Sequence, residues 1–121
     1  MPHLRLEYST NIKEKISKEL FFACHQILVA TIQADLNRCQ SRAIPCDHFY
    51  VGDGNFQQSF IYLEILVLEG RSSHQLQEMG RELLKVLENY FSTSLKELKL
   101  QIAVRVIEFS PSNYFKISYE N

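Results

Sequence analysis

The chain has 121 residues, of which 45% are apolar, so it can bury a substantial core. This length and composition predict a single domain over residues 1–121. Its 13 basic and 14 acidic residues nearly balance, which argues against a nucleic-acid partner and against a role at a membrane surface. No apolar run approaches the roughly 18 residues of a membrane-spanning helix, and no signal peptide or anchor is evident.

The chain begins with Met-Pro, and a strand-like alternation follows at once. Residues 3–8 alternate between two faces, with Leu4, Leu6 and Tyr8 on one and His3, Arg5 and Glu7 on the other. If Met1 is removed, Pro2 carries a free amine at the start of this strand. Burial near positive charge lowers the pKa of an amine into the range that a general base needs. The alternative is that Pro2 is simply part of a fraying chain terminus.

Helical spacing predicts a first helix from Ile12 to about Ala34, with a buried stripe of Ile16, Leu20, Cys24, Ile27 and Thr31. Asn11 followed by Glu14 resembles a capping box at its start. Polar breaks then lead to a short extended stretch near residues 42–51. A turn follows at residues 52–54, where the sequence is Gly-Asp-Gly.

The second half begins with the strongest predicted strand, residues 60–68, which we expect to be apolar on both faces. A Glu-Gly-Arg turn leads into a second helix, for which Ser72 and Gln75 form a capping-box candidate. The expected buried stripe of this helix consists of Leu76, Met79, Leu83, Val86, Leu87 and Tyr90. A closing strand is predicted over about residues 100–109.

The three cysteines do not indicate a disulfide framework or a metal site. Their number is odd and no C-x-x-C spacing occurs, which favours a reducing cytoplasm. Cys39, Cys46 and His48 lack a further ligand at recognised zinc spacing, so we predict no metal site. Cys24 is expected in the core of the first helix.

Strand, helix and strand thus occur twice, and the two starting strands are about sixty residues apart. Because parallel crossovers are right-handed, both helices should cover the same face of a four-stranded sheet. The predicted fold class is therefore α+β, built from two β-α-β units. The other face of the sheet would expose a large apolar patch, which predicts a symmetric oligomer.

The chain resembles the 5-carboxymethyl-2-hydroxymuconate isomerase family of the tautomerase superfamily. The resemblance covers essentially the whole chain and rests on an ordered set of short matches: Met1-Pro2-His3, Glu7, Ser9, Asn11, Ser41-Arg42, Asp53-Gly54, Gly70-Arg71-Ser72, Pro111, Phe115 and Lys116. It implies β-α-β repeats assembled as trimers or hexamers, and we expect a homotrimer. It also implies a proton shift that needs neither metal nor cofactor, with the amino-terminal proline as base.

The resemblance assigns the base to Pro2 and a substrate-binding role to Arg71. Arg71 also precedes a predicted helix N-terminus, where free N–H groups favour an anion; a solvated turn arginine is the alternative. Where the family has Arg-Ser-Arg, this chain has Gln40-Ser41-Arg42. Gln40 can form hydrogen bonds to a carboxylate but adds no charge. Arg38 or Arg42 would then take over part of the substrate binding.

The implied function is that of a cytoplasmic isomerase in aromatic-acid catabolism, acting on 5-carboxymethyl-2-hydroxymuconate or a similar small dicarboxylate. Two alternatives remain, and both arise from Gln40: a tautomerase for a different dicarboxylate, and a non-catalytic oligomeric interaction module that has kept the fold. Aromatic residues around the middle strands, at 49, 50, 56, 60 and 62, could wall a pocket that keeps the proline dry, or could belong to the core or an interface.

Overall fold

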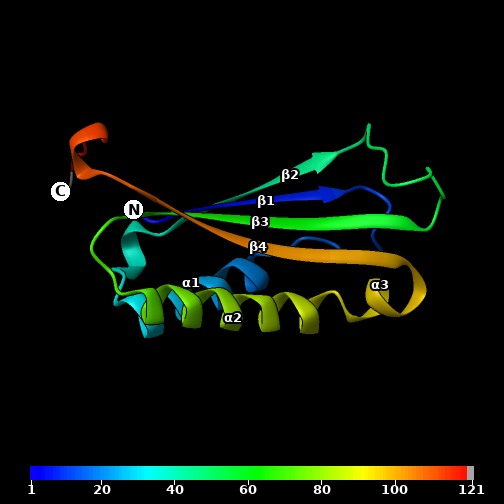
Figure 1. The fold of residues 1–121 in the computed structure, drawn as a ribbon, viewed down its shortest axis with the longest axis horizontal. Coiled ribbons are helices and arrows are strands. Elements are labelled where there is room, and N and C mark those ends of the chain that lie inside the picture. The colour runs from blue at the N-terminus through cyan, green and yellow to red at the C-terminus, as the bar shows by residue number, and fades with distance from the viewer. Residues whose placement is uncertain (120–121) are drawn as a thin grey trace.

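Two β-α-β units form the fold, as the computed structural model shows for residues 1–119 (Figure 1). The first unit consists of β1 (His3–Ser9), α1 (Lys18–Ile32) and β2 (Gln40–Cys46). The second consists of β3 (Gln58–Leu68), α2 (Ser73–Tyr90) and β4 (Lys99–Phe109). Shorter elements are α3 (Ser92–Glu97) before β4 and two 3-10 turns, η1 (Leu36–Arg38) and η2 (Pro111–Asn113).

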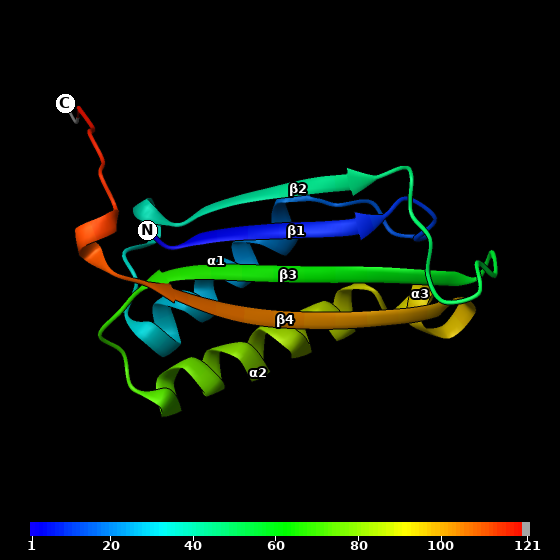
Figure 2. The same cartoon turned by 45° about the horizontal axis from the view of Figure 1, so that its top comes forward.

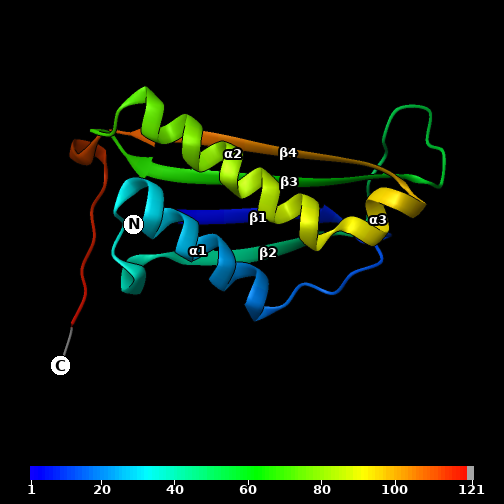
Figure 3. The same cartoon turned by 90° about the horizontal axis from the view of Figure 1, so that it is seen from below.

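The four strands form one mixed sheet in the order β2-β1-β3-β4. Each β-α-β unit contributes a parallel pair, and the central strands β1 and β3 join the two units as antiparallel neighbours. Both long helices lie on the same face of the sheet (Figure 3). The predicted α+β fold class is thereby confirmed. Within the described part of the chain, no helix combines the length and apolarity needed to cross a bilayer.

The core lies between the sheet and the two helices. Every second residue of β3, from Ile61 to Val67, is buried on this side, as period-two alternation requires. The α2 side of the core is supplied by Met79, Leu83 and Leu87, which are all fully buried. This stripe repeats at helical spacing and confirms the predicted buried face of the second helix.

The start of α2 also agrees with the sequence prediction. The Ser72 hydroxyl accepts a hydrogen bond from the Gln75 backbone N–H at 3.1 Å, and the Gln75 side chain accepts one from the Ser72 N–H at 3.1 Å. These reciprocal bonds satisfy two of the N–H groups that a helix start leaves without an intrahelical partner. The second capping box is therefore confirmed.

The first capping box is wrong, because α1 begins at Lys18 rather than Ile12. The Asn11 amide donates instead to the backbone carbonyls of Phe56 and Gln58. The Glu14 carboxylate accepts from the backbone N–H of Ser94 at 3.0 Å and from its hydroxyl at 2.5 Å. Both side chains are thus used for long-range contacts that a local pattern cannot reveal.

The open face of the sheet, opposite the helices, is less apolar than expected. Glu64 of β3 lies on it in register with Arg5 of β1 and Arg105 of β4. A charged row therefore crosses the middle of a face that otherwise carries half-buried Phe60 and Leu66.

The predicted extended stretch at 42–51 is also corrected, since β2 ends at Cys46 and residues 47–57 form a loop.

Candidate active site

One end of the sheet gathers the predicted site residues. β1 and β2 begin there, and β3 and β4 end there (Figure 2). At this end His3 is in register with Gln40 of β2 and with Leu66 of β3. The chain start, η1, the β3–α2 turn and the segment after β4 therefore meet around the first residues of β1.

Pro2 is buried at this end. Its carbonyl accepts a 3.1 Å hydrogen bond from the backbone N–H of Gln40, which extends the β1–β2 ladder to the proline. The preceding Met1 amino group donates to the Arg38 carbonyl at 3.0 Å. Burial lowers the pKa of this amino group, and the Lys116 charge lowers it further. An amine at the start of β1 is therefore held in a partly desolvated, positively charged environment.

Two of the predicted binding residues lie on β2 on the open face. Gln40 is exposed and in register with His3, whereas Arg42 is in register with Arg5. The Arg42 guanidinium donates from Nη2 to His3 Nδ1 at 3.2 Å. The open face beside Pro2 thus presents a neutral amide and a guanidinium that is already hydrogen-bonded.

Arg38 is held in η1 by a local ion pair. Its Nε lies 3.3 Å from Oδ2 of Asp35, and both side chains are about half exposed. The other oxygen of Asp35 accepts from the Asn37 N–H at 3.0 Å and so caps the turn. An exposed pair of this kind contributes little to stability, so Arg38 can exchange Asp35 for another carboxylate at small cost.

Arg71 contacts backbone carbonyls at the edge of the site. Its guanidinium donates to the Leu68 carbonyl at 3.3 Å and to the Ile32 carbonyl, at the end of α1, at 3.5 Å. Gly70 precedes it with a φ of +127°, which residues other than glycine rarely adopt. In the described residues 1–119, no hydrogen bond joins Arg71 to Pro2 or to β2. The structure therefore brings Pro2, Arg38, Gln40 and Arg42 onto adjoining segments and leaves Arg71 in the neighbouring turn.

Sequence reasoning missed His3 and Tyr114 as members of this site. His3 Nε2 lies 3.2 Å from the Tyr114 hydroxyl, beyond η2. The pKa of His3 is lowered by burial and then by the Arg42 charge. The alternation of β1 had placed His3 on the open face, but no pattern in the sequence connects it to a tyrosine over a hundred residues away.

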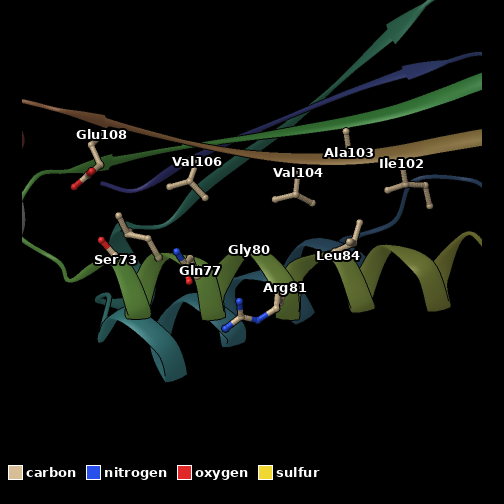
Figure 4. Close-up of a pocket in the computed structure, with 11 residues that line it drawn as sticks. Ser73, Gln77, Gly80, Arg81, Leu84, Ile102, Ala103, Val104, Val106 and Glu108 are labelled. Carbon is tan, nitrogen blue, oxygen red and sulfur yellow. The ribbon is translucent and has the colours of Figure 1, made fainter.

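A groove of about 630 Å³ lies elsewhere in the described part of the chain, between α2 and β4 (Figure 4). In Figure 4 the side chains of Ile102, Val104 and Val106 point from β4 toward the helix. A smaller cavity of about 290 Å³ is lined by aromatic residues of the 47–57 loop. This loop lies at the opposite end of the sheet from Pro2, so within one protomer these aromatics do not wall the proline site (Figure 1).

In residues 1–119, no cluster of three or more His, Cys, Asp or Glu side chains is arranged to hold a metal ion.

The two β-α-β units, with a proline at the start of the first strand, define a protein of the tautomerase superfamily. More narrowly, the chain belongs to the 5-carboxymethyl-2-hydroxymuconate isomerase family, whose sequence profile matches residues 2–119. This membership supports an isomerase of the tautomerase type. No relative was found among curated proteins.

Solved structures are similar over nearly the whole chain. A 5-carboxymethyl-2-hydroxymuconate isomerase from Deinococcus radiodurans R1 is 26% identical, with a TM-score of 0.89 over 98% of this chain and 90% of that one. A 5-carboxymethyl-2-hydroxymuconate delta-isomerase is 15% identical, with a TM-score of 0.75 over 100% and 89%. A macrophage migration inhibitory factor-like protein from Entamoeba histolytica is 18% identical, with a TM-score of 0.70 over 96% and 95%. The last two likenesses concern the fold alone.

Proposed function

We propose that this protein moves a proton along the conjugated system of an unsaturated keto acid that carries two or more carboxylates, with 5-carboxymethyl-2-hydroxymuconate as the leading substrate. The observation that carries the proposal is the burial of Pro2 at a sheet end where desolvation and then the Lys116 charge lower the pKa of the chain's amino group. Removal of Met1 converts the Pro2 nitrogen from an amide into a secondary amine. Only the amine has a basic lone pair.

In the proposed reaction, the neutral Pro2 amine removes a proton from a carbon or an enol oxygen at one end of the conjugated system. The electron pair that bound this proton delocalises as a dienolate. The protonated amine then returns the same proton at another carbon, so atoms and charge balance without metal or cofactor. Desolvation by burial, and then the Lys116 charge, lower the pKa of the amino group at this end of the sheet, which favours the neutral form of the base.

Arginines supply the other half of the proposed chemistry. A guanidinium binds a carboxylate through two parallel hydrogen bonds, and its charge stabilises the developing dienolate. We assign these roles to Arg71 and Arg42, with Arg38 and Gln40 as further contacts. Arg71 donates to two carbonyls at 3.3 and 3.5 Å, so it exchanges long hydrogen bonds to neutral acceptors for shorter, bidentate ones when a carboxylate binds.

Gln40 supports a second form of the proposal, in which the substrate differs from that of the family. A neutral amide can donate a hydrogen bond to a carboxylate, but it lacks the positive charge and the bidentate geometry of a guanidinium. A dicarboxylate that does not need a cation at this position would then be preferred. Comparison of 5-carboxymethyl-2-hydroxymuconate with shorter unsaturated dicarboxylates separates the two forms.

We further propose that the protein is a cytoplasmic homotrimer. The cysteines Cys24, Cys39 and Cys46 are free thiols, as expected in a reducing compartment. Burial raises the pKa of the Cys24 thiol to about 12, so this cysteine is an inert core residue. The half-buried apolar residues of the open face are available for contacts with other copies.

The proposal is tested with untagged protein whose intact mass shows the loss of Met1. Wild type should ketonise 2-hydroxymuconate or the enol form of phenylpyruvate, and Pro2→Ala should lower kcat by about 10²–10⁴-fold, the usual contribution of a general base. Arg71→Ala should lower both kcat and kcat/KM. Retention of Met1 in protein taken from cells would exclude the proline base. Processed wild-type protein that does not ketonise either acid would favour the non-catalytic interaction module.

A further inference from the structure

His3 bridges two segments that are distant in the sequence. Its ring accepts from Arg42 of β2 on one side, at 3.2 Å, and faces the Tyr114 hydroxyl on the other, also at 3.2 Å. The Tyr114 ring packs in turn on Phe109 at the end of β4, with ring centroids 5.3 Å apart. A hydrogen-bonded chain therefore runs from β2 through β1 to the C-terminal segment, directly beside Pro2.

The chain of bonds fixes the state of the imidazole. A guanidinium can only donate, so Nδ1 must carry the lone pair that accepts from Arg42. The proton of the neutral ring then resides on Nε2 and is donated to the Tyr114 oxygen. A protonated ring could not accept from Arg42. Both contacts together therefore require the neutral Nε2–H tautomer.

The surroundings of His3 favour this neutral form. The charged groups that act on it are Arg42 on β2, the amino terminus, and Lys116 in the C-terminal segment, and all three are positive. On β3 its cross-strand neighbour is the apolar Leu66, whereas Glu64 of that strand is in register with Arg5. Tyr114 is the remaining titratable group in contact. These positive charges and partial burial both oppose protonation.

We infer that His3 is a positioning residue of the proline site, which directs the Arg42 guanidinium and holds the C-terminal segment against the amino terminus through Tyr114. This inference rests on the proposed function. Lys116 follows Tyr114 by two residues, so the His3–Tyr114 bond keeps that charge close to the amine. His3 thus connects substrate binding, through Arg42, with the basicity of the proline, through Lys116.

Kinetics of three variants test the inference. His3→Phe, which removes both bonds, should raise KM for a dicarboxylate by about 10-fold or more, the loss expected for a hydrogen bond to a charged group, while changing kcat less. His3→Gln, which keeps a donor and an acceptor, should recover part of this loss. Tyr114→Phe should move the acidic limb of the kcat/KM profile to higher pH, because Lys116 is released. Tyr119→Phe, in the same segment and 87% exposed, is the control.

The double variant His3→Phe/Tyr114→Phe should be no worse than His3→Phe alone, since both residues act through one chain of bonds. Additive losses, or wild-type KM and pH profiles in all variants, would overturn the inference. Nitrogen NMR of the imidazole provides a readout without substrate: His3 should be the Nε2–H tautomer in wild type, and its Nε2 shift should change in Tyr114→Phe. An Nδ1–H tautomer in an active enzyme would refute the inference, whereas an inactive wild type with the expected tautomer would refute only the proposed function.

Discussion

The backbone N–H of Gln40 donates a 3.1 Å hydrogen bond to the carbonyl of Pro2. Gln40, which the resemblance matches to a family arginine, is therefore held next to the proposed base by the sheet itself. Its position relative to Pro2 is set by the β1–β2 register, in which Gln40 is opposite His3. A change of side chain at position 40 thus alters the charge beside the proline without moving the backbone.

Gln40→Arg is expected to improve turnover of 5-carboxymethyl-2-hydroxymuconate. A guanidinium adds a positive charge and a bidentate geometry that a neutral amide lacks, so KM should fall for this substrate, which has several carboxylates, and change little for the monocarboxylate phenylpyruvate. Steady-state kinetics with both acids measure the difference. Gln26→Arg is the matched control, because Gln26 is exposed on α1, on the helical side of the sheet, where the same charge is added away from the open face. Equal effects of the two substitutions would mean that general charge, not position, matters.

The sequence predicted the parts of the fold that local patterns encode. β3 was evident because residues 60–68 form a run that is apolar on both faces, and α2 because a capping box precedes a stripe at helical spacing. The start of α1 was not evident from the sequence, because the side chains of Asn11 and Glu14 form hydrogen bonds with Phe56 and Ser94. Local patterns identify capping residues, but they cannot show when a distant segment competes for the same side chain.

The candidate site, like the fold, has parts that local patterns predict and parts that they do not. Pro2 and Arg71 were found by position in motifs, and the shared sheet end follows from the topology. The partners of Arg71, the carbonyls of Leu68 and Ile32, and the His3–Tyr114 bond join segments that only the folded chain brings together. No periodicity or spacing carries that information, so these contacts required the structure.

Glu14→Gln is expected to destabilise the protein by about 1.5–3 kcal/mol, the range for hydrogen bonds to a charged group. The Glu14 carboxylate accepts from both the N–H and the hydroxyl of Ser94, and the amide can replace only one of these acceptor oxygens. Urea unfolding at fixed protein concentration measures the change. Glu88→Gln, at an exposed position of α2, should leave the midpoint unchanged. An equal midpoint for both variants would show that the Glu14 contact is not formed in solution.

Leu83→Ala should lower the free energy of unfolding by about 2–5 kcal/mol, because it leaves a cavity between α2 and the sheet. Leu83 is fully buried, whereas its neighbour Leu84 is 42% exposed in the groove beside β4. Leu84→Ala removes the same atoms with little cavity and should cost clearly less. Thermal and urea unfolding of both variants measure the two losses of unfolding free energy. A larger loss for Leu84→Ala than for Leu83→Ala would contradict the described orientation of α2.

His25 should make the protein less stable as the pH falls. Burial lowers the pKa of His25 below its ordinary 6.5, and its Nε2 lies 2.6 Å from the Ser41 hydroxyl. The unfolded chain therefore binds more protons in the window below pH 6.5, so stability is lost as the pH falls through it. His25→Gln should flatten the fall in unfolding free energy between pH 7.5 and 5.5. His48→Gln, at an exposed position, should retain the wild-type slope, and a steeper slope in His25→Gln would contradict the sign.

Light scattering of the wild type should give about three times the 14.2 kDa mass of the protomer. Ile107→Arg should shift this mass toward that of the protomer, because the residue lies on the open face, in register with Leu66 and next to the Arg5–Glu64–Arg105 row. A further arginine there adds an uncompensated charge to a surface that must be desolvated in the assembly. Gln26→Arg adds the same charge at an exposed position of α1, on the helical side of the sheet, and should leave the trimer intact. A wild type that runs at the mass of one protomer would exclude the trimer, and an Ile107→Arg variant that stays trimeric would place the subunit contact elsewhere than on the open face.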